Sequence, residues 1–136
     1  MRKLFVAAAL LLATTAFASA TVFTKYESTR QAFLAGKLKD VQKNAAQLAT
    51  QARTAKHPEV AKLADAVAKS PDLDKARVAF ATLSDALIKQ RATATAEAKP
   101  SVYHCPMVQK SWLQPKGKVG NPYDASMAMC GVLKEE

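Results

Sequence analysis

Apolar residues from position 22 to about position 98 recur every three or four positions, which is the period of an amphipathic helix. Gly36 interrupts this pattern, and Pro58 starts a new segment. Ser70 followed by Pro71 is a helix-start signal. The pattern therefore predicts four helices with short connections. Their apolar positions are Val22, Tyr26, Phe33 and Leu34; Leu38, Val41, Ala45, Leu48 and Ala52; Val60, Leu63, Ala64 and Val67; and Leu73, Ala76, Phe80, Leu83 and Leu87.

Four amphipathic helices with short connections are typical of an antiparallel bundle. No segment shows the alternation of a half-buried strand, and the chain has no repeat of solenoid length and no glycine-rich phosphate loop. We therefore predict an all-α fold, an antiparallel four-helix bundle over residues 21–99. Ser70 is expected to cap the fourth helix, with Asp72 and Asp74 near its positive end.

The composition changes at position 100, where the helical pattern stops. Residues 100–136 hold four of the six prolines, three of the four glycines and the only tryptophan. This composition predicts an irregular tail that packs on the bundle through Trp112, Leu113 and Tyr123, so that residues 21–136 form one domain. The segment "GNPYD" predicts a turn, because Pro122 restricts φ and Asn121 can bond its own backbone.

The first 20 residues have the three parts of a secretory signal peptide: the cationic pair Arg2 and Lys3, an apolar run, and the small-residue site Ala18-Ser19-Ala20. The apolar run is too short to span a bilayer, and no later stretch is apolar enough to do so. We expect cleavage after Ala20 and export to the periplasm. The net charge of +9 is spread over scattered lysines, which indicates a solvated basic surface and no nucleic-acid partner.

Soft donor side chains gather in the tail, in "YHCPM" and "SMAMCG". Residues 21–99 contain no methionine, although methionine used only as a core filler would be expected among the helices. Thiolate, thioether and imidazole together suit Cu(I); silver would satisfy the same ligands, and zinc ranks behind because it rarely takes methionine. The predicted metal ligands are Cys105, Met107, Met127 and Cys130, with His104 and Met129 as further candidates.

The spacing of these donors supports a single site. Pro106 bends the backbone so that the sulfurs of Cys105 and Met107 could face one point. Met127 and Cys130 are three positions apart, which places them on one side of a helical turn, and Met129 points away from that side. Bringing the two clusters together would create a two-thiolate site completed by methionine.

The alternative is a disulfide between Cys105 and Cys130, the usual state of two cysteines in an exported protein. It would close a loop of about 25 residues and contribute about 3–4 kcal/mol in the chain-entropy model. The methionines would then pack the tail on the bundle. A third hypothesis is a redox role in which the two cysteines cycle between thiol and disulfide.

No catalytic residue is predicted, and we expect no enzymatic activity. His104 directly adjoins Cys105, whereas cysteine–histidine catalysis needs a separate orienting group and a pocket. The chain has no C-x-x-C-H motif for covalent haem. His57 precedes Pro58 at a predicted helix start and is interpreted as structural.

The tail motifs "CPM", "WL", "NPY" and M-x-x-C-G resemble the family catalogued as domain of unknown function 3347. The helical segment "ARVAFATLSDAL", residues 76–87, also resembles that family's R-x-x-F-x-x-L-S helix, so the resemblance covers about residues 23–133. Members are exported bacterial helical domains, found alone or appended to heavy-metal efflux adaptors of the copper/silver type. This chain departs at "NPYDASM", where relatives have an aromatic residue and a glycine after the tyrosine and one more residue before the methionine.

The resemblance implies a periplasmic protein of copper or silver handling. It places metal-directed positions at Cys105, Met107, Met127 and Cys130, and structural positions at Trp112, Asn121, Pro122, Tyr123 and Gly131. The functional prediction is a periplasmic protein that holds Cu(I) through cysteine, methionine and histidine for sequestration or delivery. Its partners would be the metal ion and a heavy-metal efflux adaptor or another envelope copper protein. The alternative is a non-metal structural or interaction module of the cell envelope with a Cys105–Cys130 disulfide.

Overall fold

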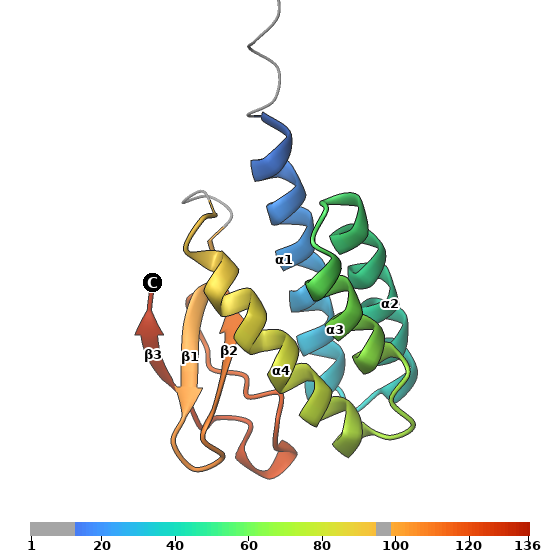
Figure 1. Ribbon diagram of the computed structural model, residues 1–136. Coiled ribbons are helices and arrows are strands. Elements are labelled where there is room, and N and C mark those ends of the chain that lie inside the picture. The colour runs from blue at the N-terminus through green and yellow to red at the C-terminus, as the bar shows by residue number, and fades with distance from the viewer. Residues whose placement is uncertain (1–12, 95–98) are drawn as a thin grey trace, which may run out of the picture.

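The computed structural model describes residues 13–94 and 99–136, so most of the predicted signal peptide lies outside the described residues. Four helices come first, followed by three strands (Figure 1). The helices are α1 (Ala13–Leu34), α2 (Leu38–Thr54), α3 (Pro58–Ala68) and α4 (Leu73–Arg91). The tail contains β1 (Ser101–Cys105), β2 (Lys110–Gln114), the short 3₁₀ helix η2 (Ala125–Met127) and β3 (Val132–Glu135).

The predicted all-α four-helix bundle with an irregular tail is wrong, because the fold is α+β. The four predicted helices are present, but the tail forms a three-stranded antiparallel sheet in the order β2-β1-β3. The sequence shows no polar–apolar alternation in this region because most residues of β1 and β2 are buried, on both faces of the sheet. β3 has only four residues, all exposed, which is too short for a pattern.

The helix boundaries follow from local chemistry, with one correction to the predicted caps. Gly36, at φ 65°, turns the chain after α1. Pro58 is the first residue of α3. An N–H at this position would have no acceptor within the helix, so proline costs no hydrogen bond there. Asp72, not Ser70, caps α4, because its carboxylate accepts a hydrogen bond from the Lys75 N–H at 2.8 Å. The Ser70 hydroxyl instead donates back to the Ala66 carbonyl of α3 at 2.8 Å.

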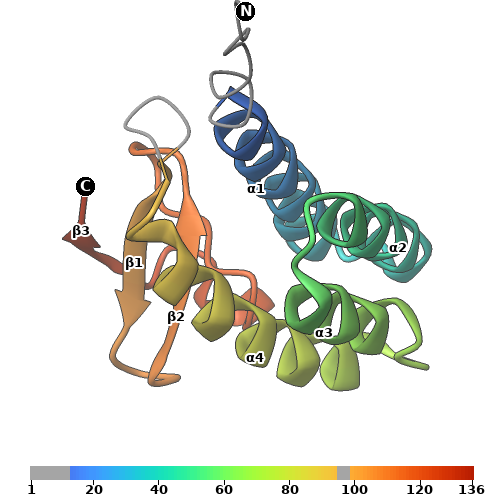
Figure 2. The same ribbon diagram turned by 45° about the horizontal axis from the view of Figure 1, so that its top comes forward.

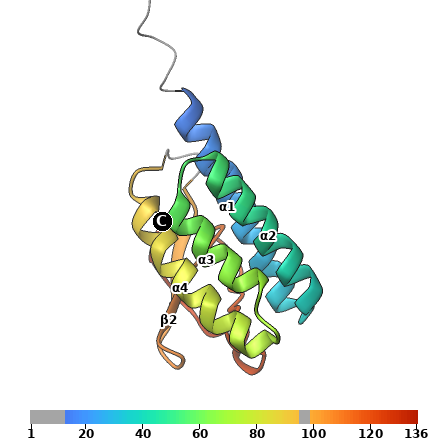
Figure 3. The same cartoon turned by 45° about the vertical axis from the view of Figure 1, so that its right-hand side comes forward.

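Helix α4 joins the helical part of the molecule to the sheet. Successive helices pack side by side from α1 to α4 (Figure 3). On its other side α4 lies against β2, which Figure 2 shows clearly. The Phe80 ring of α4 is fully buried and lies 4.7 Å from the Tyr26 ring of α1, 4.9 Å from Phe33 and 6.1 Å from Tyr123 of the tail. Helices and tail therefore share one apolar core, and the predicted burial of Trp112, Leu113 and Tyr123 is confirmed.

Two buried tyrosines close the outer edge of β2. The hydroxyl oxygens of Tyr26 and Tyr123 lie 2.7 Å and 2.9 Å from the Ser84 hydroxyl of α4. The Leu113 N–H donates to the Tyr26 hydroxyl at 3.2 Å, and the Tyr123 hydroxyl donates to the Ser111 carbonyl at 2.6 Å. Main-chain groups at a sheet edge would otherwise be open to pairing with another strand. Side chains from α1 and the tail thus take the place of a fourth strand.

Burial raises the pKa of both Tyr26 and Tyr123 above the ordinary tyrosine value. A tyrosine in the unfolded chain ionises near pH 10, whereas these two stay protonated in the folded protein. Their contribution to the free energy of unfolding is therefore fully present below about pH 10, and it is lost as the pH rises toward the pKa values of the folded protein. We expect the free energy of unfolding, measured with urea at pH 8 and pH 11, to fall less steeply in Tyr26→Phe than in the wild type. At pH 8 the free energy of unfolding of this variant should be lower by about 1–2 kcal/mol, because the hydrogen bonds of the buried hydroxyl with Ser84 and Leu113 are removed. Equal alkaline slopes in the two proteins would contradict this account.

Candidate functional site

The two cysteines of the predicted metal site form a disulfide. Cys105 is the last residue of β1 and Cys130 lies between η2 and β3, 25 positions later. Their Cα atoms are 5.4 Å apart. Cys105 is completely buried and Cys130 is half-buried. The structure therefore shows the disulfide alternative, and thiolate ligation by this pair would first require reduction.

Asn121 shapes the segment that brings Cys130 to β1. Its N–H donates to the Ala128 carbonyl at 2.8 Å, and its side-chain amide donates to the Cys130 carbonyl at 3.3 Å. Its side-chain oxygen accepts the Tyr123 N–H at 2.9 Å, which confirms the predicted turn. Asn121 is almost fully buried, so these bonds are shielded from competing water.

Two further contacts hold this segment in place. The Asp124 carboxylate caps η2 by accepting bonds from the hydroxyl and the N–H of Ser126, and these bonds lower the pKa of Asp124. Gly131 lies against Trp112, where an added Cβ atom would come within 2.6 Å of the indole ring. Only glycine fits this approach, so the residue after Cys130 is determined by packing against β2.

The three methionines of the tail flank the disulfide. Met107, in the turn between β1 and β2, is 73% exposed, and Met129 is 63% exposed. Met127 is half-buried, and its carbonyl accepts the Cys130 N–H at 2.9 Å. The alternative in which the methionines pack the tail on the bundle does not describe Met107 and Met129, since large parts of both side chains are exposed.

Four large apolar side chains of the tail are exposed, and we call them the apolar rim: Met107 in the turn between β1 and β2, Met129 just before β3, and Val132 and Leu133 on β3. Among the strands of the described residues β3 pairs only with β1, so its other edge has no strand partner in that part of the chain. Figure 1 shows β3 as the outermost strand, on the side of the sheet farthest from α2 and α3. A free strand edge with exposed apolar side chains is a typical interaction surface.

His104 lies on β1 next to the disulfide. Its ring is half-buried, and Nδ1 is 2.8 Å from the Ser111 hydroxyl on β2. In residues 13–94 and 99–136, no group of three or more histidine, cysteine, aspartate or glutamate side chains is arranged to hold a metal ion. Thioether donors fall outside that set of residue types. Metal binding by His104, Met107, Met127, Met129 and the reduced cysteines therefore stays a prediction.

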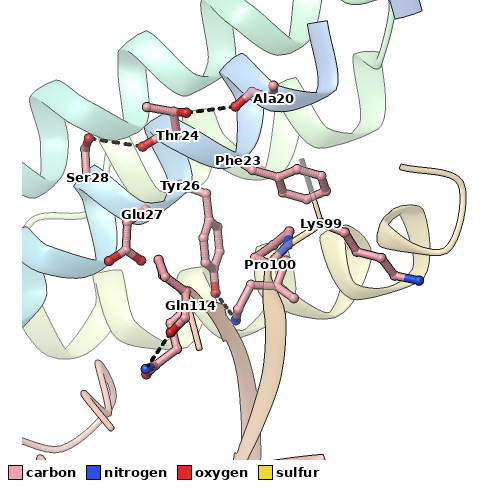
Figure 4. Close-up of a pocket in the computed structure, with 11 residues that line it drawn as sticks. Ala20, Phe23, Thr24, Tyr26, Glu27, Ser28, Lys99, Pro100 and Gln114 are labelled. Carbon is pink, nitrogen blue, oxygen red and sulfur yellow. Dashed lines mark hydrogen bonds between the residues drawn. The ribbon is translucent and has the colours of Figure 1, made fainter. Parts of the chain in front are cut away.

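An open groove of about 420 Å³ lies between α1 and the adjoining ends of β1 and β2 (Figure 4). Its apolar walls come from Phe23 and Tyr26 of α1 and from Pro100, Leu113 and Pro115. Sequence reasoning missed this groove. Phe23, Tyr26 and Leu113 could be assigned to the core, but only the tertiary fold places the entry to β1 and the exit from β2 beside α1.

A folded domain with a disulfide is consistent with a place outside the cytoplasm, because reducing conditions inside cells keep most thiols unpaired. None of the helices within the described residues has the length and apolar character that a membrane crossing needs.

Comparisons with known proteins assign no family to the chain: no protein-family model, curated protein or solved structure matches it. The resemblance to domain of unknown function 3347 therefore stays a prediction. What the chain does has to be inferred from its own disulfide, apolar rim and groove.

Proposed function

We propose that the chain is a non-catalytic interaction module of the bacterial periplasm, in which a disulfide joins two segments of the tail that packs on the helices. The supporting observation is the Cys105–Cys130 bond itself, with Cys105 fully buried in the core. In this state both cysteines have a structural role. Neither sulfur is then available as a thiolate ligand or as a nucleophile.

The apolar rim is the surface that we assign to the partner. It combines the free edge of β3 with exposed Val132 and Leu133 side chains on that strand. Such an edge can accept a strand from another protein, with main-chain hydrogen bonds providing affinity and side chains providing selectivity. The opposite edge of the sheet is closed by the hydroxyls of Tyr26 and Tyr123. The partner class implied by the family resemblance is an envelope protein such as a heavy-metal efflux adaptor.

Binding of Cu(I) by thioethers is a second candidate function. Met107 and Met129 are both highly exposed, and they lie on the two segments that the disulfide joins. Thioethers bind Cu(I) without losing a proton and remain available when the cysteines are oxidised. Delivery of Cu(I) or Ag(I) fits such a site, whereas tight sequestration would also need the reduced thiols.

Paired substitutions distinguish these two functions. Met107→Leu/Met129→Leu keeps the apolar character of the rim and removes both thioethers, whereas Met107→Ser/Met129→Ser removes both properties. A photo-crosslinking residue at position 132 should capture a periplasmic partner in the wild type and the leucine variant, but not in the serine variant. Val78 on α4 is also exposed, so a crosslinker at position 78 is the matched control and should capture nothing. Equal capture at both positions, or capture unaffected by serine, would contradict a partner site at the rim.

A Cu(I) titration against a chromophoric chelator tests the second function. If thioethers hold the metal, the oxidised wild type should compete with the chelator and the leucine variant should not. Binding that appears only after reduction, and that disappears in Cys105→Ala/Cys130→Ala, would instead assign the metal to the thiolates. Failure of both redox states to compete would exclude the copper function for this chain.

A further inference from the structure

The groove beside α1 has the size and the walls of a small-molecule site. Its volume of about 420 Å³ lies within the range of about 300–1,000 Å³ that is usual for such sites. Figure 4 shows Phe23, Tyr26 and Pro100 grouped around it, with Gln114 at its lower end. The apolar side chains come from both walls, so an apolar body lying in the groove would be covered on two sides.

A β-strand does not suit this groove. The Leu113 N–H at the edge of β2 already donates to the Tyr26 hydroxyl at 3.2 Å. Every second residue of an edge strand directs its N–H outward, and the next such position is Pro115, which has no N–H. The groove therefore offers apolar contact without a free ladder of main-chain donors.

Within the described residues, the charged groups that line the groove leave one cation without an ion-pair partner. The Glu27 carboxylate is paired with Arg30 at 2.6 Å and also accepts a bond from Gln31 at 2.9 Å. Lys99, at the edge of the groove, forms no ion pair with any residue in the part of the chain that the structure describes. Its ammonium group points away from Tyr26 in Figure 4, but its four-carbon stem is flexible enough to turn toward a bound anion.

Removal of the predicted signal peptide would add a second cation to the groove. Ala20 lines the groove, and cleavage is expected between Ala20 and Thr21. Hydrolysis uses one water molecule: the hydroxyl completes the carboxyl group of Ala20, which leaves with the peptide. The nitrogen of Thr21 takes up protons and becomes an ammonium group. The mature groove therefore lacks Ala20, and the new positive charge forms at the place where Ala20 lined the wall.

We propose that the mature chain binds a small anionic amphiphile in this groove, of the kind represented by a medium-chain fatty acid anion. Its apolar body would lie against Pro100 and Pro115, and its carboxylate would face the Thr21 ammonium and Lys99. The apolar walls select a hydrocarbon body, and the two cations select a negative head group. This site is separate from the apolar rim and from the sulfur donors, so its failure would leave the proposed interaction function untouched.

The test uses protein processed in the periplasm, with its first residue identified by mass spectrometry. Calorimetric titration with monomeric decanoate should show saturable binding of one molecule. Decanol, which lacks the charge, should bind about threefold to fivefold more weakly for each ion pair lost, and decyltrimethylammonium more weakly still. A first residue other than Thr21, or equal binding of all three probes, would overturn the proposal. Decanoate binding seen only above its micelle concentration would also overturn it.

Matched variants locate the site. Thr24→Trp should fill the groove and abolish saturable binding. Thr50→Trp on α2 should leave binding unchanged, because Thr50 is also exposed and bonded to the carbonyl four residues earlier. Lys99→Gln should weaken decanoate binding about threefold to fivefold and leave decanol unaffected, whereas Lys89→Gln should change neither. In a variant whose mature chain begins at Ala18, the affinity for decanoate should fall by a similar factor. Binding that is unchanged by both Thr24→Trp and Lys99→Gln would place any decanoate elsewhere and refute the site.

Discussion

Replacing Cys105 and Cys130 together by alanine is expected to lower the free energy of unfolding by about 3–4 kcal/mol. The disulfide joins residues 25 positions apart, and without it the unfolded chain regains the entropy of that loop. For a domain of this size the loss corresponds to a fall of about 10–20 °C in the melting temperature. Thermal and urea unfolding of the oxidised wild type and the double variant would measure it.

The reduced wild type is the matched control for this variant, because it lacks the bond but keeps both sulfur atoms. Its free energy of unfolding and its melting temperature should be close to those of the double variant. Addition of Cu(I) should leave the melting temperatures of both proteins unchanged if the cysteines are purely structural. A rise in melting temperature for the reduced wild type alone would favour the thiolate copper site over the structural role. Equal stability of the oxidised and reduced proteins would show that the disulfide does not stabilise the folded tail.

The second large effect is expected for Trp112→Ala, which should destabilise the protein by about 3–5 kcal/mol because it empties a large core volume. Trp112 is fully buried, and its ring centroid lies 6.1 Å from those of both Tyr103 and Tyr123. Its indole N–H donates to the Gln114 side chain at 2.9 Å. Equilibrium unfolding in urea gives the difference directly.

Trp112→Phe separates packing from hydrogen bonding at the same position. It keeps an aromatic ring and removes the indole donor, while the Gln114 oxygen still accepts the Gly120 N–H at 3.1 Å. We therefore expect a smaller loss, about 1–2 kcal/mol, compared with the alanine variant. An alanine variant no less stable than the phenylalanine variant would contradict the central place of this side chain in the tail.

The helices were predictable because their signals are local. Apolar residues such as Val41, Leu48 and Leu83 recur at helical spacing, and each is fully buried in the structure. The capping residue of α4 was harder to choose, since Ser70 and Asp72 are both good cap residues two positions apart. Ser70 bonds backward to α3, which leaves Asp72 to begin α4.

The sheet was not predictable, because its strands have no local signature. Val102 and Tyr103 are adjacent and both buried, so β1 shows none of the alternation of a strand with one solvated face. The two faces of the sheet are buried by α4 and by the segment that follows β2. These contacts exist only in the folded molecule. The polar and irregular composition of residues 115–131 also concealed that this segment covers a sheet.

By itself, the sequence determined the four helices, the turn at Asn121, the burial of Trp112 and Tyr123, and the gathering of sulfur atoms in the tail. These features depend on residue type and on neighbours a few positions away. Whether Cys105 and Cys130 would share a bond or a metal ion was left open by the sequence, because both outcomes need the same two residues brought together. The tertiary structure decided for the disulfide, since the Asn121 turn and the contact of Gly131 with Trp112 place Cys130 beside the end of β1. It also decided the apolar rim and the groove, because both depend on which side chains the sheet and α1 leave uncovered.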